Sequence, residues 1–263
     1  MPARAGCSIL VREDKMKKIV FAVFVIAAAA NGFAQEMQIS GGAEAAFGVF
    51  KVNNDFWYSW RDSPLPGRDV VSKSTNSVYT APGISFTVRA FPGADGAVSK
   101  GFVSRTSAVF MRSVKEKGTL AVNGDERQVS GDYTISGDVL ASVMNFGLGS
   151  SYRFRISDRF SFYTDLGLHL TVMDWEFYDT KEKLNYLGIG IFSDIAFQFS
   201  FTKRLYLELG LNSIINIFSS QKGEYAGRNG VMADYEDSGR WDLASVAGYL
   251  HIGWRVDTQN LRK

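Results

Sequence analysis

Eight segments of the chain alternate apolar and polar residues, and the connections between them are in turn long and short. The segment from Phe160 to Val172 shows this most clearly, because its apolar and polar side chains fall on opposite parities. A period of two is typical of a β-strand with unlike faces. Strands of this kind, with every long connection at one end, predict an all-β fold: an eight-stranded antiparallel up-and-down transmembrane β-barrel.

The alternation also sets the expected bounds of the strands and of the segments between them. The expected strands cover about 39–52, 83–91, 101–113, 139–156, 160–172, 187–201, 205–212 and 246–256. The long connections, at 53–77, 114–137, 175–185 and 219–240, are polar or rich in glycine and are expected to be loops. The short ones, at 92–96, 157–159 and 202–204, are expected to be tight turns.

The beginning of the chain predicts export. Lys17 and Lys18 precede an apolar run from Ile19 to Ala30, and small residues then lead to a cleavage site after Ala34. This is the order of a secretory signal peptide, and the run is too short to span a bilayer. We therefore expect residues 1–15 to lie upstream of the true start, residues 16–34 to be the signal peptide and residues 35–263 to form one outer-membrane barrel domain.

Charge and cysteine content exclude several classes of function. Five of the 29 Lys and Arg residues and two of the 27 Asp and Glu residues fall within 1–34, so the mature chain has 24 basic and 25 acidic side chains. This balance gives no reason to expect nucleic acid as a partner. Cys7 is the only cysteine, so the exported chain has neither a disulfide framework nor a thiolate metal site. We expect no metal and no cofactor.

Alternation alone also fits a soluble periplasmic β-barrel whose apolar face points inward. Here, however, the polar faces are mostly Gly, Ser and Asn, which suits a crowded lumen better than a solvated exterior. Aromatic residues also gather at the strand ends, as expected for two interfacial belts. Those expected beside the short turns are Phe91, Tyr152, Phe154, Phe160, Phe162, Phe199, Phe201 and Trp254; those beside the long loops are Trp175, Phe177, Tyr186, Phe218 and Trp241.

Isolated charges of both signs share the polar faces and are expected to pair inside the lumen, because unpaired buried charge is costly. The predicted lumen charge network is Glu44, Arg89, Arg105, Arg153, Arg155, Asp165, His169, Asp194, Glu208 and Arg255. His169 and Asp165 could act together as a base and its orienting group. No nucleophile motif accompanies them, so a buried, hydrogen-bonded histidine is the preferred interpretation and we do not expect an enzyme.

The first long connection contains an unusual aromatic cluster, formed by Phe56, Trp57, Tyr58 and Trp60. Such a cluster fits packing within the loop or the interfacial belt. It also fits an exposed anchor for a partner or for lipid. Both interpretations remain open from the sequence.

The strand count, the short turns beside both chain ends and the long opposite loops resemble the small outer-membrane barrels of the OmpX, OmpA-domain and OmpW kind. The resemblance covers about residues 36–256 and rests on architecture; the leader and aromatic loops also resemble small barrels of spirochaetes such as treponemes. It implies contact with outer-membrane lipid and with the barrel-assembly machinery. One departure is the C-terminus, since such barrels usually end on an aromatic residue whereas Trp254 is followed here by a charged tail.

Two functions follow as expectations. The first is a narrow porin-like channel or small-molecule binder of the outer membrane, because eight strands enclose room for side chains or one small ligand. The resemblance to OmpW-like barrels implies a small apolar solute, although the charged lumen departs from that role. The alternative is a surface-exposed adhesin that binds a host surface ligand through its four long loops.

Overall fold

The computed structural model describes residues 34–59, 68–93, 96–123, 128–177, 183–226, 232–239 and 241–257. Its strands are β1 (Glu36–Ser59), β2 (Arg68–Phe91), β3 (Val98–Asn123), β4 (Gln128–Arg155), β5 (Phe160–Phe177), β6 (Lys183–Ser200), β7 (Leu205–Ala226), β8 (Met232–Gly239) and β9 (Leu243–Asp257). Among these residues no helix is long and apolar enough to cross a membrane.

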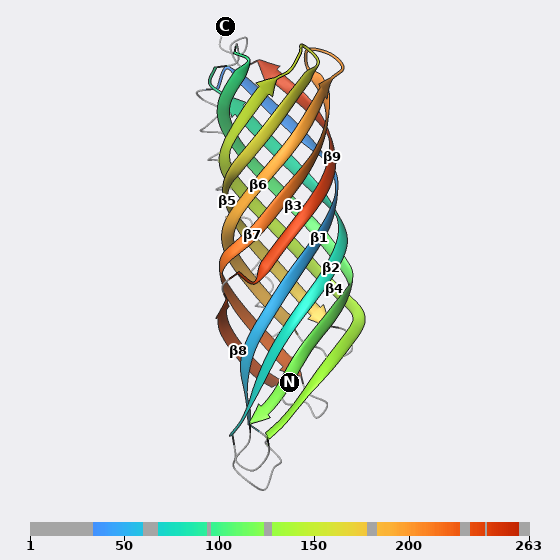
Figure 1. Ribbon diagram of the computed structural model, residues 1–263, viewed down its shortest axis with the longest axis vertical. Helices are drawn as coiled ribbons and strands as arrows, with labels where there is room; N and C mark the ends of the chain where they lie inside the picture. Colours follow the sequence, from blue (N-terminus) through green and yellow to red (C-terminus); the bar gives the residue numbers. More distant parts are fainter. Residues whose placement is uncertain are drawn as a thin grey trace, which may run out of the picture.

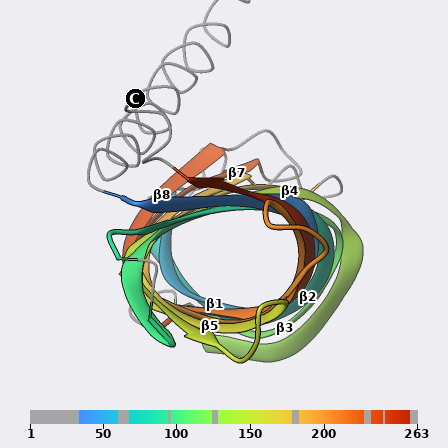
Figure 2. The same cartoon turned by 90° about the horizontal axis from the view of Figure 1, so that it is seen from above.

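The strands close into a barrel in which each wall strand pairs antiparallel with its neighbours (Figures 1 and 2). In the described part of the chain, eight strands form this wall, β1 to β7 and β9, and the pairings β1–β9, β7–β9 and β6–β7 complete the circle. β8 pairs only with the outer part of β7 and extends the wall beyond β9. The predicted all-β, eight-stranded up-and-down barrel is confirmed.

The two ends of the barrel differ. At the turn end, short connections join β2 to β3, β4 to β5 and β6 to β7, and Glu36 of β1 pairs with Asp257 of β9. At the loop end, which is the lower end in Figure 1, the hairpins β1–β2 and β3–β4 project furthest. Both described ends of the chain therefore lie at the turn end, as an even number of wall strands requires.

The predicted loop bounds are wrong at the loop end, where the strands continue much further. The β1–β2 ladder extends from Glu36↔Phe91 to Ser59↔Arg68, and the β3–β4 ladder ends at Asn123↔Gln128. Most of 53–77 and 114–137 is therefore paired strand. These extensions run through polar and glycine-rich sequence that lacks the alternation by which a strand is recognised.

The faces of the wall have the reverse polarity of a soluble barrel. Large apolar side chains are exposed on the outside at Phe47, Ile84, Phe86, Phe102, Phe110, Leu166, Leu168, Leu187, Ile189, Ile195, Phe197, Leu209, Leu211, Val246, Leu250 and Ile252. Charged side chains are buried on the inside, including Arg89 and Arg153 at 1% exposure and Glu208 at 0%. An apolar band around a polar interior is the arrangement of a barrel that lies in a bilayer.

Candidate functional site

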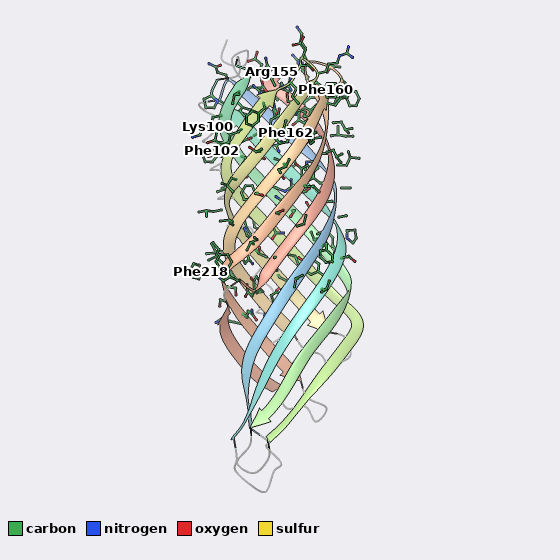
Figure 3. The ribbon with its side chains drawn as sticks, in the orientation of Figure 1. Lys100, Phe102, Arg155, Phe160, Phe162 and Phe218 are labelled. Carbon is green, nitrogen blue, oxygen red and sulfur yellow. The ribbon has the colours of Figure 1, made fainter. Side chains whose placement is uncertain are left out.

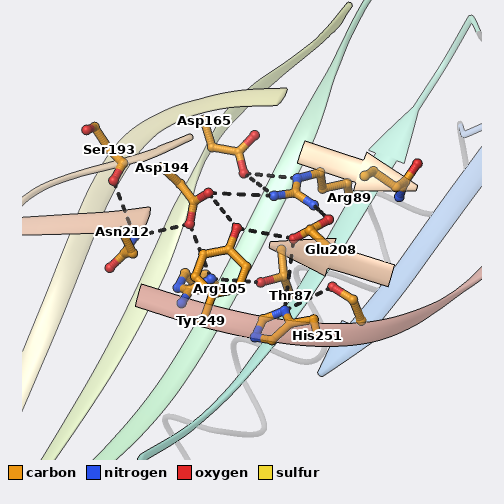
Figure 4. A network of polar contacts seen from close by, with 12 residues as sticks. Thr87, Arg89, Arg105, Asp165, Ser193, Asp194, Glu208, Asn212, Tyr249 and His251 are labelled. Atoms are coloured by element: carbon orange, nitrogen blue, oxygen red, sulfur yellow. Dashed lines mark hydrogen bonds and ion pairs between the residues drawn. The ribbon is translucent and has the colours of Figure 1, made fainter. Parts of the chain in front are cut away.

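A buried ion-pair network crosses the lumen from wall to wall, at a height between the two barrel ends. At its centre is Arg89 of β2 (Figure 4). The Arg89 guanidinium donates through Nε to Asp165 Oδ2 at 2.9 Å and through Nη1 to Glu208 Oε2 at 2.6 Å. Asp165 belongs to β5 and Glu208 to β7, so one arginine links the opposite sides of the barrel. Such charge-assisted bonds are the strong ones when both partners are withdrawn from water.

The second arginine of this network, Arg105 of β3, holds the other two carboxylates. Its Nη2 donates to Glu44 Oε2 at 2.8 Å, and its Nη1 lies 3.2 Å from Asp194 Oδ2. The Tyr249 hydroxyl lies 2.7 Å from Asp194 Oδ1 and 3.2 Å from Glu208 Oε1, and so connects the two halves. We call this set the central network: Glu44, Arg89, Arg105, Asp165, Asp194, Glu208 and Tyr249.

A second polar cluster fills the lumen at the turn end. Glu36 Oε1 accepts a hydrogen bond from Arg153 Nη1 at 2.6 Å and lies 3.1 Å from Arg255 Nε. Arg255 also donates to Gln198 Oε1 at 2.9 Å, and the Tyr163 hydroxyl donates to the same oxygen at 2.8 Å. This mouth cluster lies next to the central network, because the Tyr163 ring packs 4.7 Å from the Arg89 guanidinium.

Aromatic rings support three of the inner arginines. Besides Arg89 over Tyr163, Arg105 lies 4.2 Å from the Tyr249 ring and Arg153 lies 4.6 Å from the Phe91 ring. A ring face attracts a cation and leaves the edge of the guanidinium free for carboxylates. Tyr163 and Tyr249 had no predicted role and Phe91 was expected in the outer belt, although all three lie on the inward parity of their strands.

The structure brings together eight of the predicted network residues: Glu44, Arg89, Arg105, Arg153, Asp165, Asp194, Glu208 and Arg255. Arg155 is a correction. It lies exposed at the last residue of β4, where the strand leaves the wall and the side chain reaches solvent. Glu36, which the sequence analysis omitted, occupies the lumen instead. Among the described residues the inner arginines are therefore outnumbered by carboxylates.

His169 is buried on the inner face of β5, but its partner is not Asp165. Its Nε2 lies 2.5 Å from Asn216 Oδ1, and Asn216 Nδ2 donates to the Tyr186 hydroxyl at 2.6 Å. Because that amide oxygen can only accept, Nε2 carries the proton and the ring is held in one tautomer. The base-and-orienter pair considered from the sequence is thus not formed between these two side chains.

A group of apolar side chains also fills the lumen, on the loop side of the central network. The inward side chains Phe50, Met173, Phe192, Ile214 and Leu243 are buried together, and we call them the apolar layer. Along β1 the inward residues Glu36, Glu44 and Phe50 follow one another, so the layer lies on the loop side of the central network. Phe91 and Tyr186, predicted to belong to the outer belts, also point inward and are corrections.

A small cavity lies where the polar and apolar parts meet. Its volume is about 10 Å³, which suffices for roughly one water molecule. It is lined by Arg105, Ser107, Asn145, Gly147, His169, Phe192, Asn212 and Ile214. Where the structure describes the side chains around this cavity, they leave room for little more than that water.

The side chains of Phe56, Trp57 and Tyr58 and the whole of Trp60 lie outside the described residues. In the described part of the chain, no group of three or more His, Cys, Asp or Glu side chains is arranged to hold a metal ion.

An apolar exterior and an interior filled by ion pairs decide the class of architecture. The chain folds as a small outer-membrane-type β-barrel. Similar solved structures include OprG of Pseudomonas aeruginosa (TM-score 0.43, 14% identity, covering 85% of this chain and 96% of that one) and Ail of Yersinia pestis (0.42, 12%, 85% and 99%). Neisserial surface protein A is also similar (0.44, 10%, 84% and 96%). No family model and no curated protein matches the sequence.

Proposed function

We propose that the protein is an integral outer-membrane barrel, exported by its leader, that binds a surface ligand through its loop end while its lumen stays closed. The observation that carries this proposal is that two successive layers of side chains fill the lumen. Arg89 and Arg105 bridge the walls in one layer, and Phe50, Phe192 and Leu243 are buried in one apolar cluster in the next. Free passage of ions would require both layers to rearrange.

The strands beyond the belt supply the surface for such binding. The β1–β2 and β3–β4 ladders continue well past the exposed apolar residues Val49 and Phe110, so paired strands extend outward from the barrel. Paired strands hold their shape without lipid contact. A host or envelope ligand would therefore meet a preformed surface.

Conductance tests the closed lumen. Refolded wild-type protein in planar bilayers should show only small, infrequent steps. Steady, porin-sized conductance would contradict a closed lumen and would favour a channel.

Shortening one hairpin tests the binding surface. Deleting 118–123 with 128–133 removes matched ladder pairs of β3 and β4 and keeps their connection. Cells that display this variant should adhere less to a cultured-cell monolayer than cells that display the wild type. Equal adherence, with the variant still folded and displayed, would contradict binding through this hairpin.

A narrow conduit or small-ligand site is the second candidate, and the cavity favours it. The cavity adjoins Arg105 and His169, and the lumen is blocked by side chains alone, with no inserted segment among the described residues. On this hypothesis Asp194→Ala, which removes one partner of Arg105, should open a measurable leak in the same bilayer assay.

A further inference from the structure

Exposed cations gather at the turn end of the barrel, where the structure describes most of the side chains. At the turn end the exposed cations are Lys100, Arg155, Arg159, Lys203 and Arg204, whereas the exposed carboxylates there are Asp158 and Asp257. The cations come from β3, from the end of β4 and from the connections β4–β5 and β6–β7. They therefore follow the rim rather than a single turn.

Lys100 differs from the other cations because it lies on the wall itself. On the outward parity of β3 it stands between Val98 and Phe102, and it faces Tyr152 of β4 in the ladder. Its Nζ lies 5.7 Å from the centroid of the Tyr152 ring. Figure 3 shows Lys100 beside Phe102, below Arg155 and at about the height of Phe162.

A cation beside apolar rings matches a ligand that has both an anionic group and an apolar part. The exposed rings of Phe102, Tyr152 and Phe154, at 47%, 38% and 38% exposure, form an apolar and aromatic surface directly beside a fixed ammonium group. A phosphate diester attached to acyl chains would meet the cation and the rings at once, because lipid phosphates lie at the border of the hydrocarbon. A soluble phosphate would use only the cation.

We propose that Lys100, together with the cationic rim formed by Arg155, Arg159, Lys203 and Arg204, is a headgroup site that selects anionic phospholipids at the turn end. The inference rests on the proposed insertion into a membrane and names the lipid class that the barrel retains. Lys100 and Tyr152 form the part of the site on the wall. The rim residues raise the local concentration of anionic lipid around them.

Native mass spectrometry can test this with protein refolded into phosphatidylcholine vesicles that contain a minority of phosphatidylglycerol. The wild type should retain phosphatidylglycerol above its share of the vesicle. Lys100→Gln should lower that enrichment about fivefold, the effect of one cation at an anionic surface. The combined variant Lys100→Gln, Lys203→Gln and Arg204→Gln should lose it further.

Lys222→Gln is the matched control, since Lys222 is an exposed lysine near the loop end of β7. It should leave the enrichment unchanged. The proposal is overturned if the combined variant retains as much phosphatidylglycerol as the wild type, or if Lys222→Gln loses as much as Lys100→Gln.

Added inorganic phosphate separates a lipid headgroup from a free anion. Phosphate that displaces the bound lipid at low millimolar concentration would show an anion site and overturn the lipid assignment; unchanged retention supports it. A heat-dependent shift in gel mobility reports barrel insertion separately. A wild type that never inserts overturns the proposed membrane function, whereas an inserted barrel without lipid preference overturns only this inference.

Discussion

Arginine is the scarcer partner in the central network. Two guanidinium groups, of Arg89 and Arg105, face four carboxylates, and all of these groups are nearly removed from water. The Tyr249 hydroxyl lies within hydrogen-bond distance of both Asp194 and Glu208 and so reduces the repulsion between these two carboxylates. Loss of one arginine therefore leaves several carboxylates without a counter-charge, while loss of one carboxylate leaves each arginine with another partner.

Arg89→Met should consequently destabilise the barrel by about 3–5 kcal/mol, the usual effect of breaking a buried pair from one side. Asp194→Asn should lower the free energy of unfolding much less. Arg105 keeps Glu44 at 2.8 Å, and the amide oxygen still accepts a hydrogen bond from Tyr249. Urea unfolding of the refolded barrel, followed by tryptophan fluorescence, measures both. Equal costs would contradict the imbalance described above.

Two glycines on β9, Gly248 and Gly253, differ in how much space an added Cβ would find. A Cβ at Gly253 would collide with the ring of Tyr206, whereas at Gly248 it would meet only Leu211 Cδ2, at 3.8 Å. Gly253→Ala should therefore lower the free energy of unfolding by about 1–3 kcal/mol through overpacking, and Gly248→Ala should change it little. Similar values for the two alanine variants, measured by the same unfolding experiment, would show that the Tyr206 ring is free to move aside.

Alternation in the sequence predicted the wall strands well wherever one face meets lipid and the other the lumen. Parity alone also placed Arg89, Arg105 and Asp194 inside, as the structure has them. It failed at the strand ends: Arg155 lies outside the lumen, and the hairpins extend through polar sequence without alternation. The same parity rule, applied consistently, would have placed Phe91 and Tyr186 inside.

The partners inside the lumen could not be predicted from the sequence in the same way. Arg89 and Glu208 are 119 residues apart in sequence, and their contact depends on the stagger of all the strands between them. Alternation sets the face of a residue but not its height in the barrel. Irregularities such as the register shift between Ile189 and Gly190 change that height, and the amino-acid sequence does not reveal them clearly.

One buried residue, Asp242, anchors the junction between β8 and β9. Trp241 has a φ of 54°, and the next residue, Asp242, turns inward and is buried. Its carboxylate accepts from the Tyr186 hydroxyl at 2.7 Å, from Gln221 Nε2 at 3.1 Å and from the Ser219 hydroxyl. The short junction between β8 and β9 is therefore held to β6 and β7 by the Asp242 carboxylate.

Asp242→Ala should loosen β8 while the rest of the barrel stays closed, because three buried donors lose one acceptor. Amide hydrogen exchange should become faster in β8 and in the paired part of β7, with exchange in β5 unchanged. Asp242→Asn keeps one acceptor oxygen and should show a smaller effect. Uniform acceleration over all strands would instead make Asp242 part of the global core.

The whole barrel combines an apolar belt with two ends of different construction. Phe160 lies at the turn-end level of the belt and Phe218 at the loop-end level, both exposed (Figure 3). Both described chain ends lie with the short turns, and the long hairpins lie at the opposite end. For an exported chain inserted from the inner side, this arrangement predicts that the hairpins face the cell exterior.

Two exposed lysines at opposite ends can test that orientation, because residues 35–263 contain no cysteine. Lys222 lies on β7 near the loop end, and Lys203 lies in the turn between β6 and β7. A membrane-impermeant maleimide added to intact cells should label Lys222→Cys and should miss Lys203→Cys, because the outer membrane shields the turn end. After the cells are broken, both should react, which controls for accessibility. Labelling of Lys203→Cys alone on intact cells would invert the topology and would move the cationic rim to the outer leaflet.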